Sequence, residues 1–123
     1  MVTVPAFLLK RLYVKGSLKP TPDGFEFRVE NKLGSGYATE MLPVTLDGEP
    51  FPLDQSYFRP DGEDEVRFSE VGSDKPFTLE VGKGLAIGVH GTPPPTAGPH
   101  KVGLGFVVQG ISALSFEVSE VVQ

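Results

Sequence analysis

Hydrophobic and polar residues alternate with a period of two along much of this chain. Phe25, Phe27 and Val29 are apolar, and the residue that follows each of them is charged. Residues 112–119 repeat this pattern, with serine and glutamate between the apolar positions. Such alternation is typical of a β-strand with one buried face. No window has the period of an amphipathic helix, and the best candidate, Leu53 to Phe58, is only one turn long.

Turn signals separate the alternating segments about every ten residues. The strongest is Asp47-Gly48, because both residues tolerate the positive φ angles of a type I′ hairpin turn. The pattern predicts about eight or nine short strands. They are drawn from the ranges 7–15, 24–31, 38–46, 49–53, 56–59, 65–69, 77–81, 84–90, 100–108 and 112–119. This spacing favours a sandwich or a barrel, and we expect a single-domain antiparallel β-sandwich over residues 1–123.

The composition fits this fold and narrows the choice of partners. With 123 residues the chain can bury one core, and its 15 glycines and 12 prolines favour short elements. The absence of cysteine excludes disulfides and thiolate chemistry. A net charge of −5 argues against nucleic-acid binding, and no segment resembles a signal peptide or a membrane span. We expect a cytoplasmic protein that binds neither nucleic acid nor membranes, with a composition that would suit a thermophilic source.

The two histidines of the chain, His90 and His100, stand at either end of a proline-rich loop. If the strands 84–90 and 100–108 form one hairpin, their alternation places the two imidazoles on opposite faces of the sheet. Ligands of one metal should converge, and no third ligand stands at a suitable spacing. We expect no metal or other cofactor, with a metal site at both histidines as the alternative. The favoured interpretation is a stiff connector, with His100 partly buried at the start of a strand and bonded to the backbone of a neighbouring loop.

On the faces of these two strands that point away from the core, five positions carry no charge. Their residues are small or apolar: Ala86, Gly88, Gly103, Gly105 and Val107. Glycine within a strand lowers stability and often marks the close approach of another backbone. We therefore expect these residues to form one smooth strip that is covered by a partner subunit or by another part of the chain, such as the N-terminal segment.

A second candidate site is the segment Asn31 to Leu42. A Gly-Ser-Gly turn at 34–36 is followed by Tyr37, Thr39 and Glu40, which offer an aromatic ring, a hydroxyl and a carboxylate. Such a loop can contact a ligand or a partner. The alternative is an ordinary loop in which Tyr37 packs at the base.

The middle of the chain resembles the small β subunit of bacterial C-glycoside deglycosidases. The resemblance runs from about Tyr37 to Phe106, and its matching positions are Val44, Leu46, Asp47, Gly48, Glu49, Pro52, Phe58, Gly62, Gly98 and His100. It implies an antiparallel β-sandwich that joins a larger, metal-dependent catalytic subunit and supplies no metal ligand itself. The N-terminal strand and the C-terminal residues have no counterpart in that family.

These observations lead to two expectations about function. The first is a non-catalytic accessory subunit, bound to a larger enzyme or to copies of itself through the glycine strip. The second is a module that binds a small, carbohydrate-like ligand through Tyr37, Glu40 and His100. No catalytic residue is assigned, and a metal-dependent enzyme that uses both histidines is the remaining alternative.

Overall fold

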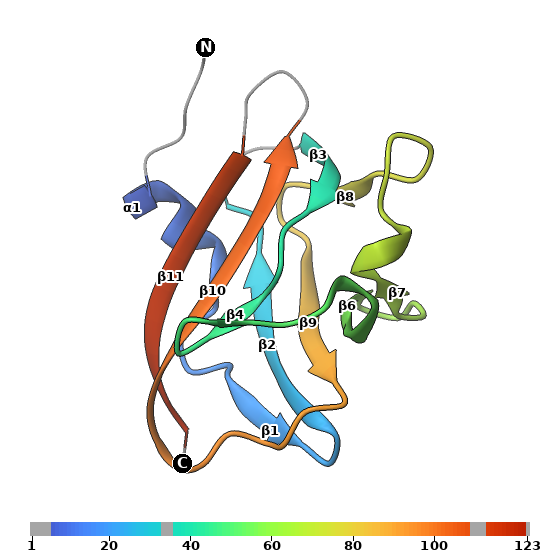
Figure 1. The fold of residues 1–123 in the computed structure, drawn as a ribbon. Helices are drawn as coiled ribbons and strands as arrows, with labels where there is room; N and C mark the ends of the chain where they lie inside the picture. The colour runs from blue at the N-terminus through green and yellow to red at the C-terminus, as the bar shows by residue number, and fades with distance from the viewer. Residues whose placement is uncertain (1–5, 33–35, 109–112, 123) are drawn as a thin grey trace.

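The computed structural model describes residues 6–32, 36–108 and 113–122. In this part of the chain two antiparallel β-sheets face each other across a hydrophobic core, with short helical segments beside them (Figure 1). The predicted all-β antiparallel sandwich is confirmed. The described residues form eleven strands, because the predicted range 38–46 divides into two strands and one further strand precedes residue 24.

Sheet A has the strand order β1-β2-β9-β6-β7. Its strands are β1 Lys19–Thr21, β2 Gly24–Glu30, β6 Ser56–Pro60, β7 Val66–Arg67 and β9 Gly84–His90. The alternation in β2 has the predicted effect, since Phe25, Phe27 and Val29 point into the core and are almost completely buried. The sequence did not predict β1, whose central residue is Pro20. Proline is tolerated there because β1 is an edge strand that pairs only with β2.

Sheet B has the strand order β5-β4-β10-β3-β8, and β11 pairs with the other edge of β10. Its strands are β3 Gly36–Met41, β4 Thr45–Leu46, β5 Glu49–Pro50, β8 Phe77–Leu79, β10 Gly98–Val108 and β11 Ala113–Val122. One edge of β10 pairs with β3 and β4 in turn, and the other pairs with β11 along ten residues (Figure 1). β10 is therefore the strand that holds sheet B together.

Aromatic side chains join the two sheets inside the sandwich. Phe58 of sheet A packs edge-on against Phe77 of sheet B, with ring centroids 4.6 Å apart, and Phe77 in turn lies 6.5 Å from Phe106. Around them lie the most deeply buried aliphatic side chains, which include Met41, Val44, Leu85, Ile87, Val89 and Val102. Burial of this apolar surface is the main favourable term in folding.

The predicted strand at 7–15 is wrong. Residues Ala6–Leu9 form helix α1 and Lys10–Leu12 form the 3₁₀ helix η1, which lie beside β11 (Figure 1). Leu9 and Leu12 are buried while Lys10 between them is exposed, and a three-residue spacing places side chains on one face of a helix. No helix among the described residues is long and apolar enough to cross a membrane.

Two further 3₁₀ helices end predicted strands early. η2 covers Leu53–Gln55, and η3 covers Phe68–Glu70, the second half of the predicted range 65–69. The backbone N–H of Arg67 donates a 2.9 Å hydrogen bond to the Glu70 carboxylate, which stabilises the start of η3.

The predicted hairpin of residues 84–90 and 100–108 does not exist. β9 lies in sheet A between β2 and β6, whereas β10 lies in sheet B. The proline-rich loop between them therefore crosses from one sheet to the other. Alternation along a strand defines its two faces but does not identify the strand that pairs with it.

Candidate functional site

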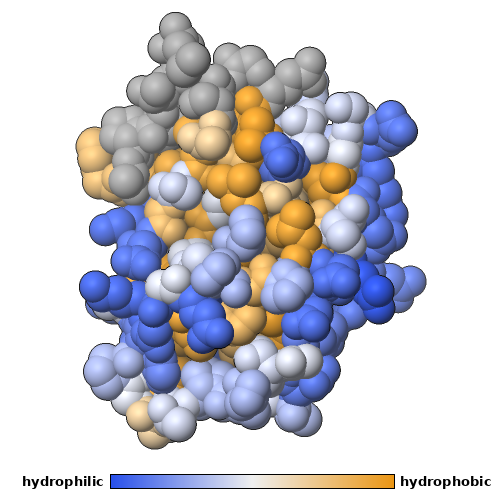
Figure 2. Space-filling view, viewed as in Figure 1, coloured by the Kyte–Doolittle hydropathy of each residue, from blue (hydrophilic) through white to orange (hydrophobic). Residues whose placement is uncertain are grey.

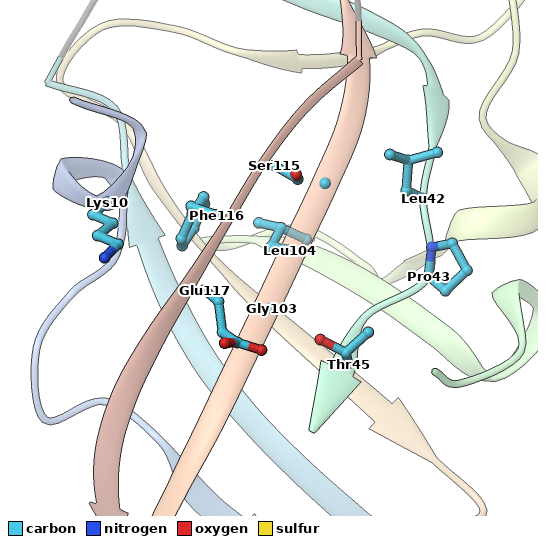
Figure 3. Close-up of a pocket in the computed structure, with 10 residues that line it drawn as sticks. Lys10, Leu42, Pro43, Thr45, Gly103, Leu104, Ser115, Phe116 and Glu117 are labelled. Atoms are coloured by element: carbon cyan, nitrogen blue, oxygen red, sulfur yellow. The ribbon is translucent and has the colours of Figure 1, made fainter. Parts of the chain in front are cut away.

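The outer face of sheet B, which points away from the core, carries a glycine-floored groove. In β10, Val102 and Leu104 face the core, so Gly103 and Gly105 face outward. Gly103 lies between Thr45 of β4 and Glu117 of β11, its cross-strand neighbours, and Gly105 lies opposite Ser115 (Figure 3). The absence of side chains on two outward positions of the central strand creates the floor.

The groove is shallow and open, with a volume of about 620 Å³. Its lining residues are Lys10, Leu42, Pro43, Thr45, Gly103, Leu104, Gly105, Ser115, Phe116 and Glu117. A Cβ atom on Gly103 would collide with the Thr45 hydroxyl, and one on Gly105 would lie 3.0 Å from the Leu42 side chain. Neighbouring side chains of the same sheet thus lean over both glycines and form the groove walls.

The segment with Tyr37, Thr39 and Glu40 lies on the same sheet. Glu40 is exposed and pairs with Val107 of β10, while Tyr37 is 45% exposed and pairs with Thr78 of β8. Thr39 is the extra residue at a β-bulge, where the pairing of β3 with β10 shifts register. Of the predicted turn before them, residues 34 and 35 lie outside the described residues.

The structure thus brings two of the predicted groups of residues together on one face. Figure 2 shows this face, on which apolar surface gathers in the upper and central part and polar side chains lie along the sides. Val107, Gly105 and Gly103 follow one another down β10, with Glu40 beside the first. His100 does not join them, because it has the parity of the inward-facing residues of β10.

The predicted strip is wrong as a single surface. Ala86 and Gly88 belong to β9, so they lie on the outer face of sheet A, on the opposite side of the sandwich. A Cβ atom on Gly88 would collide with the ring of Tyr57, its cross-strand neighbour on β6. Gly88 is therefore covered by the chain's own tyrosine, as the alternative of an internal cover anticipated, although the N-terminal segment is not the cover.

A buried polar network surrounds that tyrosine. The Tyr57 hydroxyl donates a 2.7 Å hydrogen bond to Glu26 Oε2, and Arg59 Nη2 donates one of 3.1 Å to Glu26 Oε1. Lys19 Nζ lies 3.9 Å from the same carboxylate. Burial alone would raise the pKa of Glu26, but the hydrogen bonds from Tyr57 and Arg59 outweigh it and lower that pKa. Glu26 is therefore a charged carboxylate whose hydrogen bonds remain within the protein.

His90 covers this network from the outside. Its ring stacks on Tyr57 with centroids 4.4 Å apart and an interplanar angle of 20°. His90 Nε2 lies 3.0 Å from Glu65 Oε1, and Nδ1 lies 3.4 Å from Asp23 Oδ2. His90 thus connects the turn before β2, the segment before β7 and the end of β9.

His100 has two oxygen partners at the start of β10. Its Nδ1 lies 2.7 Å from Asp47 Oδ2, and its Nε2 lies 2.7 Å from the carbonyl oxygen of Thr96. The Asp47 hydrogen bond, followed by that to Thr96, raises the pKa of the His100 imidazole above its usual value. The same hydrogen bond from His100, followed by that from the Lys101 backbone, lowers the pKa of Asp47. The contact with Thr96 agrees with the predicted partly buried residue bonded to loop backbone.

The two histidines do not converge on a common centre, because they lie in different sheets and each has its own carboxylate partners. Among the residues that the structure describes, no group of three or more His, Asp or Glu side chains is placed to hold a metal ion. The metal alternative therefore has no supporting geometry in this part of the chain.

Sequence reasoning missed the network of Glu26, Tyr57 and Arg59. Glu26 and Arg59 stand next to apolar residues and so resemble ordinary solvent-facing positions, whereas Tyr57 follows a serine. One available signal was Gly88, because a glycine inside an otherwise regular strand often marks the close approach of another group. The pairing of β6 with β9 was needed to identify that neighbour as Tyr57.

The fold and the groove define this chain as an antiparallel β-sandwich with a shallow depression on one outer sheet face. A sequence profile of the family described as hydroxymethylglutaryl-CoA reductase, N-terminal domain, matches residues 8–123. Because the match covers nearly the whole chain, the chain belongs to this family. No curated protein matches it.

This family membership overturns the resemblance to the small β subunit of C-glycoside deglycosidases. The positions that carried that resemblance are features of hairpins and strand starts in general. Asp47 and Gly48, with φ angles of 53° and 84°, form the tight turn between β4 and β5, and Gly98 begins β10. Unrelated β-sandwiches need the same residue types at such places.

Proposed function

We propose that this chain is a non-catalytic accessory module that docks on the catalytic region of a hydroxymethylglutaryl-CoA reductase through the outer face of sheet B. The family description supports the partner, since it names an N-terminal domain of that enzyme. The structural observation that carries the proposal is the open groove on the outer face of sheet B, whose glycine floor is overhung by Thr45 and Leu42.

The chemistry of the groove indicates the surface that would fit it. Leu42 and Pro43 form an apolar wall, and the carboxylates of Glu40 and Glu117 lie on the same face. A complementary partner would insert a small apolar side chain over Gly105 and place basic groups near the two glutamates. Apolar cores with charged rims are the usual anatomy of such interfaces, and complementary charge favours association and register.

Ser115 is the best position at which to test this interface. A charged residue at Gly103 would collide with Thr45 and so would disturb the fold as well as the interface. Ser115 is exposed at the groove edge, so Ser115→Lys adds bulk and positive charge without a buried contact. Ser69→Lys is the matched control, because Ser69 is an exposed serine of η3 and does not line the groove.

The experiment measures binding of the full chain to the purified catalytic region of a reductase from the same source, by biolayer interferometry. We expect saturable binding that Ser115→Lys weakens at least tenfold and Ser69→Lys leaves unchanged. Absence of binding by the wild-type chain, or equal binding by both variants, would overturn the proposal. Self-association that only Ser115→Lys disrupts would assign the groove to a second copy of this chain and would also overturn it.

A second candidate function is a module for a small carbohydrate-like ligand. The observation that favours it is the partly exposed ring of Tyr37 on the face that also carries Glu40, because rings and carboxylates bind sugar faces and hydroxyls. His100 does not belong to this ligand set, since it lies at the other end of β10. Calorimetric titration with a panel of monosaccharides tests the idea, and binding must disappear in Tyr37→Ala while the state of assembly is unchanged.

A cytoplasmic location, a thermophilic source and homo-oligomer formation remain predictions from the sequence. The accessory role also implies that the isolated chain has no catalytic activity of its own. Activity of the purified chain on a hydroxymethylglutaryl-CoA substrate, without any partner, would contradict that role.

A further inference from the structure

The arrangement around His100 requires a protonated imidazole. Both ring nitrogens face oxygen acceptors at 2.7 Å, namely the Asp47 carboxylate and the Thr96 carbonyl. A neutral imidazole has one N–H donor, so one of these contacts would place a nitrogen lone pair against an oxygen lone pair. The imidazolium has two donors and satisfies both contacts at once. The His100 side chain is also largely shielded, with 11% of its surface exposed.

Asp47 transmits this contact to the β4–β5 hairpin. Its Oδ1 accepts a 2.9 Å hydrogen bond from the Lys101 backbone N–H, and its own N–H donates one of 2.8 Å to the Lys101 carbonyl. The strand before it, β4, contains only Thr45 and Leu46. So short a strand has few backbone hydrogen bonds to β10, and Asp47 is the anchor at its end.

The same hairpin forms a wall of the groove. Thr45 pairs with Gly103 and lies directly over it, two residues before Asp47. On the other side of His100, Thr96 belongs to the proline-rich loop that joins the sheets. One imidazolium thus ties the loop and the groove wall to the start of β10.

Two further charged residues, Glu120 and Lys101, are neighbours of His100. From β11, Glu120 is its direct cross-strand partner, and the Glu120 carboxylate accepts a 2.7 Å hydrogen bond from the Gly16 backbone N–H. Lys101, the adjacent residue, is exposed and has the opposite parity in β10, and its positive charge also acts on Asp47. Asp47 is thus the carboxylate that contacts the imidazole directly, and its negative charge favours the protonated form.

We propose that His100 is a proton-dependent staple, which holds both the β4–β5 hairpin and the proline-rich loop against β10 when protonated and loses one of these two contacts when it is deprotonated. This staple controls the position of Thr45 in the groove. The inference rests on the proposed function only for its consequence in partner binding, because the staple itself is a property of the isolated chain.

The direction of the pH dependence follows from the two pKa shifts. The raised pKa of His100 gives a contribution that is complete below its unfolded value of about 6.5 and is lost as pH rises through the higher folded value. The lowered pKa of Asp47 gives a contribution that is present above about 3.9 and is lost as pH falls through the lower folded value. The staple is therefore closed below about pH 6.5 and opens as the pH rises through the higher folded pKa of His100.

Nuclear magnetic resonance on the full chain between pH 5 and pH 9 tests the staple directly. We expect the His100 ring to titrate above about 6.5, and the Thr45 and Gly103 amide signals to shift with the same midpoint. In His100→Gln these amide shifts should disappear, and exchange of the Asp47 amide with solvent should become severalfold faster. His90→Gln is the matched control, because it removes a histidine with carboxylate partners from the other sheet and should leave these signals unchanged.

Asp47→Asn is a second test variant, which keeps the staple testable if His100→Gln fails to fold. Asparagine tolerates the positive φ of this turn and keeps an accepting oxygen, but it removes the negative charge. We expect the His100 midpoint to fall in this variant. Two results would overturn the staple. The first is a His100 midpoint at or below about 6.5, and the second is Thr45 and Gly103 amide signals that do not shift with the His100 titration. Failure of partner binding with these titrations intact would overturn only the proposed function.

Discussion

The Tyr57 hydroxyl and the Glu26 carboxylate form a 2.7 Å hydrogen bond on the outer face of sheet A. Only 3% of the surface of Tyr57 and 6% of the surface of Glu26 are exposed. The ring of His90 and the side chain of Arg59 help to exclude water from this pair. Burial and the adjacent Glu26 charge both raise the pKa of Tyr57, so the phenol remains a donor throughout the neutral range. The pair is thus a fixed donor and acceptor on the outside of a sheet.

Removal of this hydrogen bond should destabilise the fold. Tyr57→Phe leaves a buried carboxylate with one donor fewer, and we expect the free energy of unfolding to fall by about 1–3 kcal/mol. Urea denaturation of Tyr57→Phe, Glu26→Gln and the double variant gives the coupling energy between the two residues. A coupling smaller than about 0.5 kcal/mol would mean that the hydrogen bond is not a stabilising unit.

The contribution of Glu26 should depend on pH. Because its folded pKa is lowered, the stabilisation is present above the unfolded value of about 4.3 and is lost as pH falls through the folded value. The wild-type chain should therefore exceed Glu26→Gln in stability by a constant amount from pH 6 to pH 8, and this difference should shrink below about pH 4. Thermal unfolding of both proteins across this range is the measurement. A difference that grows in acid would contradict the lowered pKa.

Gly88 should tolerate no side chain. In Gly88→Ala the added methyl group would displace the Tyr57 ring from the sheet and strain its bond to Glu26, at a cost of about 2–3 kcal/mol. Gly36→Ala is the matched control, because Gly36 is also a strand residue and a Cβ there meets no atom within 4 Å. Chemical denaturation compares the two, and equal stability of the variants would show that Tyr57 can move aside at little cost.

Tyr13 is a second tyrosine with a buried hydroxyl, and it differs from Tyr57 in the hydrogen bonding of that hydroxyl. Its hydroxyl is buried near Ser17 and Glu120 but has no hydrogen-bond partner among the described residues. Burial is also the main reason that the pKa of Tyr13 is raised. Because an unpaired buried hydroxyl lowers stability, Tyr13→Phe should leave the free energy of unfolding unchanged or raise it by up to about 1 kcal/mol. A loss of more than 1 kcal/mol would indicate that the hydroxyl is bonded in solution.

The strands of this fold could be read from the sequence where alternation was regular. The predicted range 84–90 coincides with β9, and Phe25, Phe27 and Val29 face the core as expected. The N-terminal segment misled this reasoning, since its few apolar residues fit either a strand or a short helix. The helix forms because it buries Leu9 and Leu12 against the rest of the protein, and these tertiary contacts cannot be read from a single sequence.

The candidate site could be predicted only in part, because strand partners are set by long-range contacts. Gly103, Gly105 and Val107 do lie on one outer face of β10, as their parity required. Their association with Gly88 failed because consecutive strands were assumed to pair, whereas β9 and β10 belong to different sheets. The nearness of Glu40 to Val107 depends on the pairing of β3 with β10, which no local pattern reveals.

The central place of β10 has a consequence for the order in which this chain can fold. All strands of sheet A are complete by residue 90, whereas sheet B needs the last hairpin, β10 with β11, before its parts connect. Until then β3 with β8 and β4 with β5 are separate two-stranded pieces, which are marginal in water. During synthesis sheet A can therefore form early, while its apolar inner face is not yet covered by sheet B. Closure is a late, long-range event, of the kind that slows folding and exposes a nascent chain to aggregation.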